Sequence, residues 1–353
     1  MKKYLLPETG NFYKANLHCH TTGSDGKKSP EEVRELYRSM GYSVVAYTDH
    51  DVFFDRSELR TPDFLPLNGI EVEFYAPRTP ESLKKIGCVH LCLIALEEDN
   101  LLTPLYHRTK YVKYNEEEAR RKMRFDEAEP DFERGWGTEE INAAIALAKK
   151  KGFFVTYNHP EWSFEDETRL VQYRGLDAIE IFNSGSVALG YGDNTPAHYR
   201  ALARHGIRLY PIAADDNHNP RPLGDRRSDC GLGWVQIKAE KLEYRTVTRA
   251  LQNGDFYAST GPEIHSLWTE DGTVHVTCSP ADEVSISYIG GGYRRLIAGT
   301  GAEDPKGFHR YSGKESVTEA SFTLEPICGA FRVEVHDKHR RTASTRYYYP
   351  QEW

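Results

Sequence analysis

The chain has 353 residues, of which 39% are hydrophobic and 28% are charged, a composition typical of a globular protein rather than a disordered one. This length predicts two domains, because one hydrophobic core rarely serves so many residues. The formal net charge of −8 argues against a protein whose main task is to coat nucleic acid.

The first residues, MKKYLLPETGNFYK, lack the apolar segment of a signal peptide. The sequence contains no run of about 18 apolar residues, so we expect no membrane span. The six cysteines have neither the spacing of a disulfide scaffold nor that of a structural zinc site. We therefore expect a cytoplasmic protein that binds neither bulk nucleic acid nor a membrane, and the sequence leaves its oligomeric state open.

Helices and apolar strands alternate over the first two thirds of the chain. The segment SPEEVRELYRSMG (29–41) predicts a helix that Ser29 caps, that Glu32 supports through a capping box, and that Gly41 ends. The segment YSVVAYTDHD (42–51) follows as a buried strand that runs into polar residues. This pairing of a helix with a strand is the first of several.

The same order recurs further along. TEEINAAIALAKKKG (138–152) predicts a helix capped by Thr138 and stopped by Gly152, and FFVTYNHPEW (153–162) predicts the next strand. LDAIEIFNS (176–184) and GIRLYPIAADDNH (206–218) repeat the strand pattern. Repeated units of this kind predict an α/β fold with a largely parallel sheet or barrel, whose active site lies at the carboxyl ends of the strands.

A charged insertion occupies residues 97–137. It is either a solvated helix with paired charges or a lid whose Arg120, Arg121 and Arg124 reach an anionic substrate.

From about Ile264 onward the pattern changes to short alternating strands. Asp271-Gly272 is a hairpin turn signal, and the expected strands include VSISYIGGG (284–292), ASFTLE (320–325), FRVEVHD (331–337) and TRYYYP (345–350). Residues 263–353 are therefore expected to form a small all-β, sandwich-like domain, in which we find no catalytic constellation.

Histidines and acids gather after the strands of the first domain. Each has an ordinary structural alternative, but at least five strand ends supply them, and two supply i, i+2 pairs that share one face of a strand. Imidazole with carboxylate suits Zn, Mn or Fe, and the set is too large for one ion, so two or three ions bridged by a carboxylate are expected. The candidates are His18, His20, Asp25, His50, Glu71, His90, His159, Asp216 and His218.

The nine candidates lie in six short motifs, HCHTTGSDG, YTDHD, GIEV, VHLCLIAL, NHP and DDNH, and the segment LQNGDFYASTGP follows them. These motifs resemble, in order, those of the PHP family, the polymerase and histidinol phosphatase superfamily, and LQNGDFYASTGP is similar to the segment that closes its catalytic domain. The resemblance covers about residues 12–262, so residues 1–262 are expected to form the catalytic domain. It implies a distorted (β/α)7 barrel and a di- or trinuclear site that hydrolyses phosphate esters.

The resemblance also implies a role for each ligand. One metal is bound by His18 and His20 and shares Asp216, Glu71 is a bridge, a second metal is bound by His90 and His159, and a third is bound by Asp25, His50 and His218. Asp25 stands where some members have histidine, and a carboxylate favours Mn or Fe over Zn. Asp216 is preferred over Asp215 because Asp-x-His places it beside His218 on a strand.

The implied activity is that of a phosphoesterase acting on a small phosphorylated metabolite or nucleotide. A metal-bridging hydroxide is the nucleophile, and no protein nucleophile is expected. Asp49 or Asp51 can orient His50, with Glu180 and Asn183 near the site, and Arg226 or Arg227 is expected to bind the phosphate. Two alternatives stay open: a metal-dependent hydrolase of a carbon ester, lactone or amide, and a binding module with a relic site.

Overall fold

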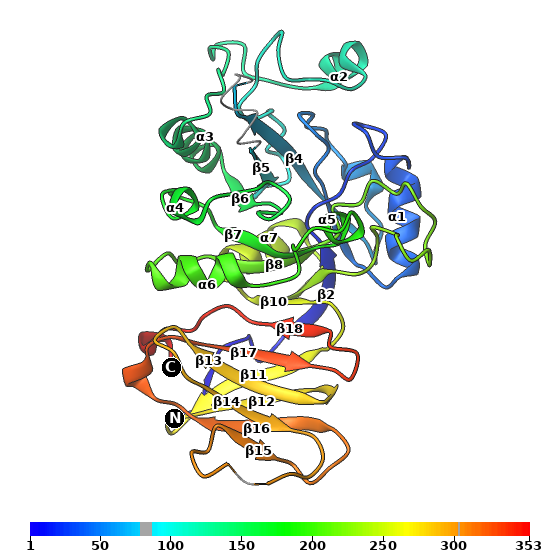
Figure 1. The fold of residues 1–353 in the computed structure, drawn as a ribbon. Helices are drawn as coiled ribbons and strands as arrows, with labels where there is room; N and C mark the ends of the chain where they lie inside the picture. The colour runs from blue at the N-terminus through cyan, green and yellow to red at the C-terminus, as the bar shows by residue number, and fades with distance from the viewer. Residues whose placement is uncertain (78–86, 303) are drawn as a thin grey trace.

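The structure is a computed structural model that describes residues 1–77, 87–302 and 304–353. It has two lobes. An α/β lobe contains strands β2 to β10 and the seven α-helices of the described residues, and a β lobe contains β1 and strands β11 to β18 (Figure 1). Both chain termini lie on the β lobe. Within the described part of the chain, no helix is long and apolar enough to cross a bilayer.

The α/β lobe is built on one row of hydrogen-bonded strands in the order β10-β9-β2-β3-β4-β5-β6-β7-β8. The strands are β2 (Asn11–Asn16), β3 (Val44–Tyr47), β4 (Leu65–Tyr75), β5 (Cys88–Ala95), β6 (Phe153–Tyr157), β7 (Ala178–Asn183), β8 (Tyr210–Ala214), β9 (Trp234–Ala239) and β10 (Phe256–Ser259). The fold is thus mixed α/β around a large sheet.

The sheet is not uniformly parallel. The pairs β2–β3, β3–β4, β6–β7 and β7–β8 are parallel, whereas β5 runs antiparallel to both β4 and β6. The expected repetition of parallel units is therefore broken at β5. Because β5 is reversed, its amino-terminal half lies beside the carboxyl-terminal half of β4, and Glu73 opposes His90.

The segments that follow β2 and β8 also pair with each other. The backbone N–H of Asp216 donates to the carbonyl of His18 at 3.0 Å, and that of His20 donates to the carbonyl of Asn217 at 3.1 Å. Two strands at distant places in the sheet order are therefore joined at their carboxyl ends, where the candidate ligands lie.

The helices of the α/β lobe are α1 (Pro30–Ser39), α2 (Glu116–Lys122), α3 (Thr138–Lys150), α4 (Glu167–Leu170), α5 (Ser184–Ala188), α6 (Ala197–Arg204) and α7 (Tyr244–Asn253). The predicted capping box of α1 is confirmed, since Ser29 and Glu32 exchange hydrogen bonds. The predicted cap of α3 is wrong: Thr138 is the first helical residue, and Gly137 takes the cap position without a side-chain bond.

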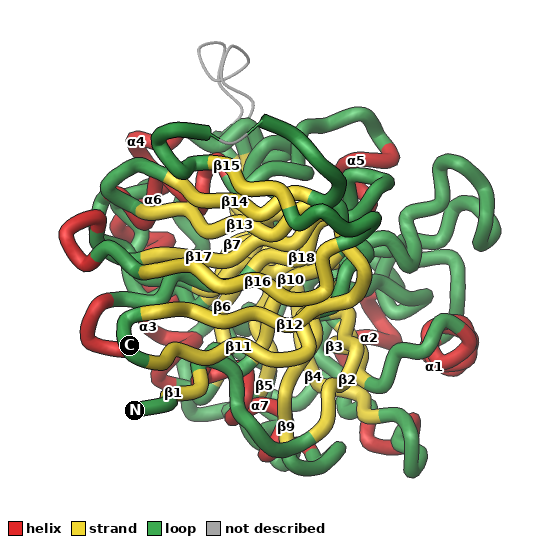
Figure 2. The backbone as a smooth tube through the Cα atoms, turned by 90° about the horizontal axis from the view of Figure 1, so that it is seen from below, coloured by secondary structure: helices red, strands yellow, loops and turns green. Residues whose placement is uncertain are grey.

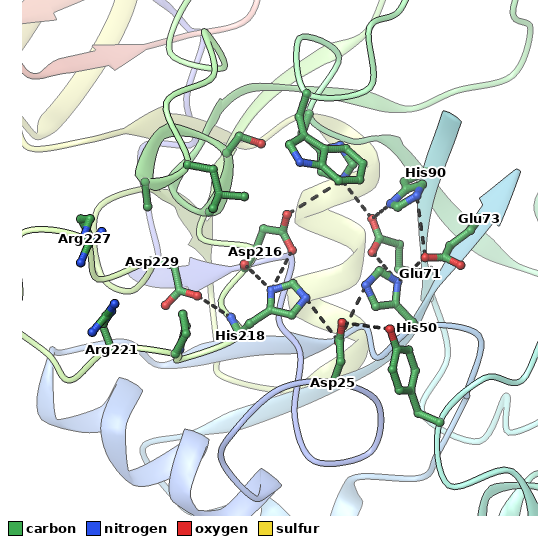
Figure 3. Close-up of a pocket in the computed structure, with 18 of the residues that line it drawn as sticks. Asp25, His50, Glu71, Glu73, His90, Asp216, His218, Arg221, Arg227 and Asp229 are labelled. Carbon is green, nitrogen blue, oxygen red and sulfur yellow. Dashed lines mark hydrogen bonds and ion pairs between the residues drawn. The ribbon is translucent and has the colours of Figure 1, made fainter. Parts of the chain in front are cut away.

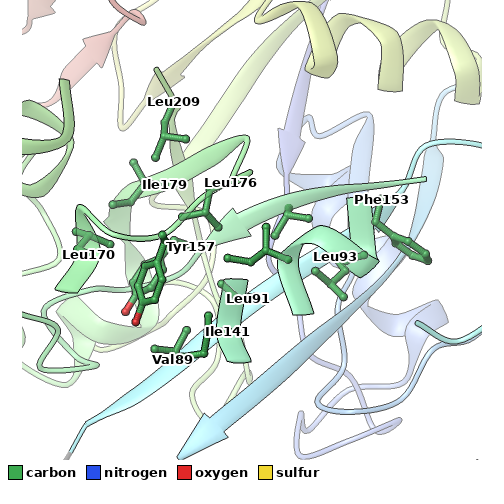
Figure 4. Close-up of a cluster of buried hydrophobic side chains, with 14 of the residues drawn as sticks. Val89, Leu91, Leu93, Ile141, Phe153, Tyr157, Leu170, Leu176, Ile179 and Leu209 are labelled. Atoms are coloured by element: carbon green, nitrogen blue, oxygen red, sulfur yellow. The ribbon is translucent and has the colours of Figure 1, made fainter. Parts of the chain in front are cut away.

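One apolar cluster explains why β5 can present a histidine to the interior. Val89, Leu91 and Leu93 lie on one face of β5 and pack against Ile141 of α3 and the neighbouring strands (Figure 4). Burial of each such side chain contributes about 1.5–3 kcal/mol. Since alternate residues of a strand face opposite ways, this packing turns His90 to the other face.

The β lobe contains two sheets, whose strands Figure 2 shows from below. One is a four-stranded sheet, β1 (Lys3–Tyr4), β11 (Ile264–Glu270), β12 (Thr273–Ala281) and β16 (Val317–Thr323). The other continues the large sheet from β10 through β18 (Thr342–Ser344), β17 (Phe331–His336), β13 (Glu283–Tyr288), β14 (Tyr293–Ile297) and β15 (His309–Tyr311).

This lobe confirms one sequence prediction, contradicts another and includes a strand that was not predicted. The Asp271-Gly272 turn is confirmed between β11 and β12, and both residues have positive φ, 47° and 75°. The expected strand over 345–350 is wrong, since within this segment only Tyr348 forms an isolated bridge, to Phe331. The N-terminal β1 pairs with β11 and so adds an early segment to the late lobe.

Candidate metal centre

The nine predicted ligands converge at one end of the sheet of the α/β lobe, to which the reversed β5 contributes its amino-terminal half. Seven of them line a cavity of about 590 Å³, and Figure 3 shows the side chains of the six that it labels pointing toward one another. His18 and His20 are fully buried in the same cluster, within ion-pair distance of Glu71 and Asp216. The seven lining residues are Asp25, His50, Glu71, His90, His159, Asp216 and His218.

The first group of potential ligands comes from the two paired segments after β2 and β8 and from β4. His18, His20, Glu71 and Asp216 have ligand atoms within 4.8 Å of one another. Nε2 of His18 lies 3.2 Å from Glu71, and Nε2 of His20 lies 3.0 Å from Asp216. Two imidazoles and two carboxylates are a donor set that suits Zn, Mn or Fe.

The second group shares a carboxylate with the first. Glu71, His90 and His159 meet the same 4.8 Å criterion, and Oε1 of Glu71 lies 3.3 Å from both imidazoles. Glu71 therefore stands between the two groups, in the position of a bridging carboxylate.

The third group is His20, Asp25, His50 and His218. Asp25 is 3.3 Å from His218 and 3.8 Å from His50, but Nδ1 of His20 is also within 3.9 Å of it. The sequence separated Asp25 from both His18 and His20, whereas the structure separates it from His18 only. Gly26 makes this approach feasible, because a Cβ there would lie 2.7 Å from the backbone of His20.

Glu73 was not predicted, although it belongs to a fourth group with His50 and His90. The signal was present in the sequence, since Glu71-x-Glu73 repeats the i, i+2 spacing of His18-x-His20. The ammonium group of Lys113, from the charged insertion, contacts Glu73.

Several buried atoms of the cluster have no hydrogen-bond partner, which is the observation that fits bound metal. A buried polar atom without a partner costs about 1–3 kcal/mol, so such atoms are rare unless something else satisfies them. They are Nδ1 of His20, Nδ1 of His50, Oε2 of Glu71, both ring nitrogens of His90 and Oδ1 of Asp216. These atoms belong to the side chains that form the four groups.

The electrostatics of the cluster are strongly coupled. Burial alone would lower the pKa of His20, but the Asp216 and Glu71 carboxylates outweigh it and raise that pKa to about 10. Burial alone would raise the pKa of Glu71, but His18 and His90 hold it well below its usual range. The carboxylates thus stay ionised and hold protons on neighbouring rings, which a divalent cation would displace.

Glu180 and Asn183 on β7 contact three of the candidate ligands. Glu180 accepts hydrogen bonds from Nδ1 of His18 and from the backbone N–H of His159, each at 2.8 Å. Asn183 donates to Glu180 at 2.8 Å and to Asp216 at 3.3 Å. Asn158, which sequence reasoning missed, donates to Glu71 at 2.7 Å.

The Asp215-Asp216 doublet divides into two roles. Asp215 is fully buried and accepts from Tyr37, Ser184 and the backbone N–H groups of Gly231, Leu232 and Gly233. Asp216 instead points into the cluster, with a φ of 50°, and His159 has a φ of 28°. Positive φ at two candidate ligand positions is backbone strain of the kind that gathers at functional sites.

Asp49 and Asp51 have partners other than the His50 ring. Asp49 accepts hydrogen bonds from Thr21 and Ser24 and pairs with Arg56 at 2.9 Å, so it fixes the loop that carries Asp25. Asp51 pairs with Arg134 of the insertion at 2.6 Å. Among the described residues, neither carboxylate is within hydrogen-bond or ion-pair distance of His50.

Of the two arginines that were expected to bind phosphate, only Arg227 lines the cavity. Arg227 lines it together with Arg221, and neither guanidinium has an acidic partner among the residues that the structure describes, whereas Arg226 is exposed and not part of the lining. Figure 3 shows both lining arginines on the side away from His90.

The insertion reaches the centre, but through residues other than the predicted arginines. Tyr114 lines the cavity and donates to Asp25 at 3.3 Å. Arg120 is used within the insertion, where it binds Glu116 and the carbonyl of His107. Arg121 and Arg124 do not line the cavity either. Apolar walls come from Trp162, whose ring lies 4.8 Å from that of His159, and from Leu189.

No family model and no curated protein matches the chain. Among solved structures, it is similar to a two-domain protein containing a predicted PHP-like metal-dependent phosphoesterase from Bacteroides vulgatus, at 15% identity and a TM-score of 0.43, over 98% of both chains. It is also similar to a putative metal-dependent phosphoesterase from Bifidobacterium adolescentis, at 20% identity and a TM-score of 0.36, over 64% of this chain and 94% of that one. A third similar structure is an amidohydrolase from Chromobacterium violaceum with bound sulfate, at 16% identity and a TM-score of 0.37, over 58% of this chain and 87% of that one.

Proposed function

We propose that the chain is a PHP-type metal-dependent phosphoesterase that hydrolyses a phosphate ester of a small metabolite or nucleotide. The main support for this proposal is a set of buried imidazole and carboxylate atoms that lack hydrogen-bond partners and gather at one cavity. Two arginines without acidic partners, Arg221 and Arg227, line the same cavity and favour an anionic substrate.

Two or three divalent ions would be held by the groups described above, with Glu71 shared between two of them. The carboxylate of Asp25 favours Mn or Fe over Zn at its group. When bound, such ions lower the pKa of coordinated water towards about 7 and neutralise phosphoryl oxygens.

The chain's own residues position the reactants. Glu180 keeps the proton of His18 on Nδ1, so that Nε2 is free to act as a ligand. Arg221 and Arg227 are placed to make charge-assisted hydrogen bonds to substrate oxygens, and Trp162 and Tyr114 form walls that restrict water. No serine or cysteine nucleophile is needed.

We also infer that strands β2 to β8 form the distorted seven-stranded barrel expected from the motifs. The support is the pairing of the segments after β2 and β8, which brings Cys19 into a bridge with Asn217. A barrel closed in this way would bring the ligands of the first and last strands together.

A reducing, cytoplasmic setting is part of the same proposal. All six cysteines are free thiols, and five of them are buried. Buried unpaired thiols are common where disulfides do not form.

The test is turnover by metal-reconstituted protein. Full-length protein loaded with Mn, Zn or Fe should release phosphate from at least one compound in a panel of mono- and diesters, and Asp216→Asn should not. Glu161→Gln is the matched control, because Glu161 binds His198 outside the cluster. Hydrolysis of a lactone or amide without phosphate release would favour the carbon-ester alternative, and bound metal with no turnover on either panel would contradict both.

A further inference from the structure

A second cavity, of about 600 Å³, lies between the two lobes. Figure 1 shows β8 and β10 of the α/β lobe directly above β18 and β17 of the β lobe. None of the nine predicted ligands lines this cavity. The apolar part of its lining consists of Ile181, Phe182, Pro196, Ala213, Leu232 and Ala258.

The rim of this inter-lobe cavity carries unpaired positive charge. Arg200 of α6 and Arg340 of the β17–β18 loop both line it and are exposed, and neither has an acidic partner among the residues that the structure describes. Two exposed guanidinium groups from different lobes therefore border one apolar hollow.

The other charges of the lining are already balanced. Arg341 pairs with Asp337 at 2.6 Å, and Glu334, the one acid in the lining, pairs with the fully buried Arg332 at 2.6 Å. His336 uses Nδ1 for a 3.0 Å hydrogen bond to Thr342, which leaves its Nε2 available. Among the described residues, the unpaired charges of the cavity lining are therefore those of Arg200 and Arg340.

We propose that the inter-lobe cavity is a binding site for a small organic phosphate with an apolar body. Arginine is the residue best suited to bidentate contacts with phosphate oxygens. Two unpaired guanidinium groups match a dianion better than a carboxylate, which brings one charge. The apolar lining residues suit the carbon body, as in most small-molecule sites, where a few polar groups orient a ligand against hydrophobic walls.

This site is separate from the metal centre but shares a strand with it. Ile181 of β7 faces the inter-lobe cavity, while Glu180 and Asn183 of the same strand contact His18 and Asp216. Phe182 also reaches the inter-lobe cavity, because the pairing of β7 with β8 shifts register between Glu180 and Phe182. A ligand bound here would touch the reverse side of the strand that positions the metal ligands.

The test is calorimetric titration of full-length protein with phenylphosphonate, which is not a hydrolysable ester. Arg200→Gln/Arg340→Gln should lose one binding equivalent or bind at least tenfold more weakly at one site. The control Arg204→Gln, which removes an exposed arginine of the same helix that does not line the cavity, should match wild type. The lost equivalent should also be present in metal-stripped wild-type protein, so the result does not depend on the proposed catalytic function.

Benzoate should bind this site at least tenfold more weakly than phenylphosphonate, and benzyl alcohol should not bind detectably. Equal isotherms for the double variant and Arg204→Gln would overturn the site, and equal affinity for benzoate would overturn the dianion assignment. If the double variant does not fold, Arg200→Gln and Arg340→Gln are compared singly, since each side chain is exposed.

Discussion

Nδ1 of His18 lies 2.8 Å from Oε1 of Glu180, and both side chains are almost fully buried. Because a carboxylate only accepts, Nδ1 must carry a ring proton, and Nε2 faces the cluster 3.2 Å from Glu71, where a bound metal ion would replace the proton on Nε2. The other oxygen of Glu180 accepts from the backbone N–H of His159 and from Asn183. One carboxylate on β7 thus ties two ligand-bearing segments together.

Glu180→Gln should therefore weaken metal binding without removing a ligand. A glutamine amide places an N–H₂ group where the carboxylate accepted, so at least one of the three donors loses its acceptor. Residues that orient metal ligands typically contribute about 10–100-fold in affinity, and we expect a loss in that range by competitive metal titration. Glu161→Gln, which alters a Glu–His pair outside the cluster, should leave affinity unchanged, and equal losses in both variants would contradict the positioning role.

The residues of the centre could be predicted from the sequence because histidines and acids recur just after the strands. The reason given for the pairs His18-x-His20 and Asp216-x-His218 was wrong, however, since β2 ends at Asn16, β8 ends at Ala214 and Asp216 has a positive φ. All four side chains reach the cluster from the segments that follow these strands, and strand alternation does not place them there. Glu71-x-Glu73 has the same spacing, but Glu73 becomes a candidate ligand only because the reversed β5 places His90 opposite it. The direction of a strand is a tertiary property that local patterning does not fix.

The partners of the polar loop residues could not be predicted for a related reason. Asp49 is next to His50 in sequence, yet it binds Thr21, Ser24 and Arg56. Likewise, the insertion contacts the centre through Lys113, Tyr114 and Arg134 rather than through its most charged helix. Which side of a loop faces a site depends on how the whole segment docks, and charge composition does not encode that.

Asp215 and Asp216 should respond to amide substitution in opposite ways. Asp215→Asn removes acceptors from several buried donors, so the free energy of unfolding should fall by about 1–3 kcal/mol while folded protein keeps its metal. Asp216→Asn should lower the number of bound metal ions per chain, measured by elemental analysis. Full metal content in Asp216→Asn, or loss of metal in folded Asp215→Asn, would reverse the assignment of the doublet.

The stability of metal-stripped protein should fall as pH rises. His20 has a pKa of about 10 in the folded chain, above its ordinary 6.5, because the Asp216 and Glu71 carboxylates outweigh the effect of burial. A group whose pKa rises on folding contributes stability that is fully present below the unfolded pKa and is lost as pH approaches the folded one. Metal replaces that proton, so metal-loaded protein should lack this decline.

The measurement is thermal unfolding at pH 7 and pH 9.5, with and without bound metal. The midpoint of the stripped protein should drop between the two values, and that of the loaded protein should change less. His198→Gln is the control, because its ring pairs with Glu161 away from the cluster and should leave the difference intact. Parallel pH profiles for both forms would show that protons and metal do not compete at these rings.

The insertion should be anchored to the centre by one buried ion pair. Arg134 is 7% exposed and Asp51 is 2% exposed, and their charged groups are 2.6 Å apart. Removing one partner of a buried pair leaves an uncompensated charge, which costs about 3–5 kcal/mol, so Arg134→Met should be strongly destabilising by chemical denaturation. Arg134→Met/Asp51→Asn should recover part of that loss, because no charge is left behind.

The deficit of Arg134→Met should also shrink as pH falls. Burial raises the pKa of Asp51 to about 6 even with Arg134 present, and without the guanidinium it should rise further, so mild acid neutralises the stranded carboxylate. Lys122→Met is the control, since its pair with Glu118 is exposed on both sides and such pairs contribute roughly 0.5 kcal/mol or less. A deficit of similar size for Lys122→Met and Arg134→Met would mean that the insertion is held by its surface contacts instead.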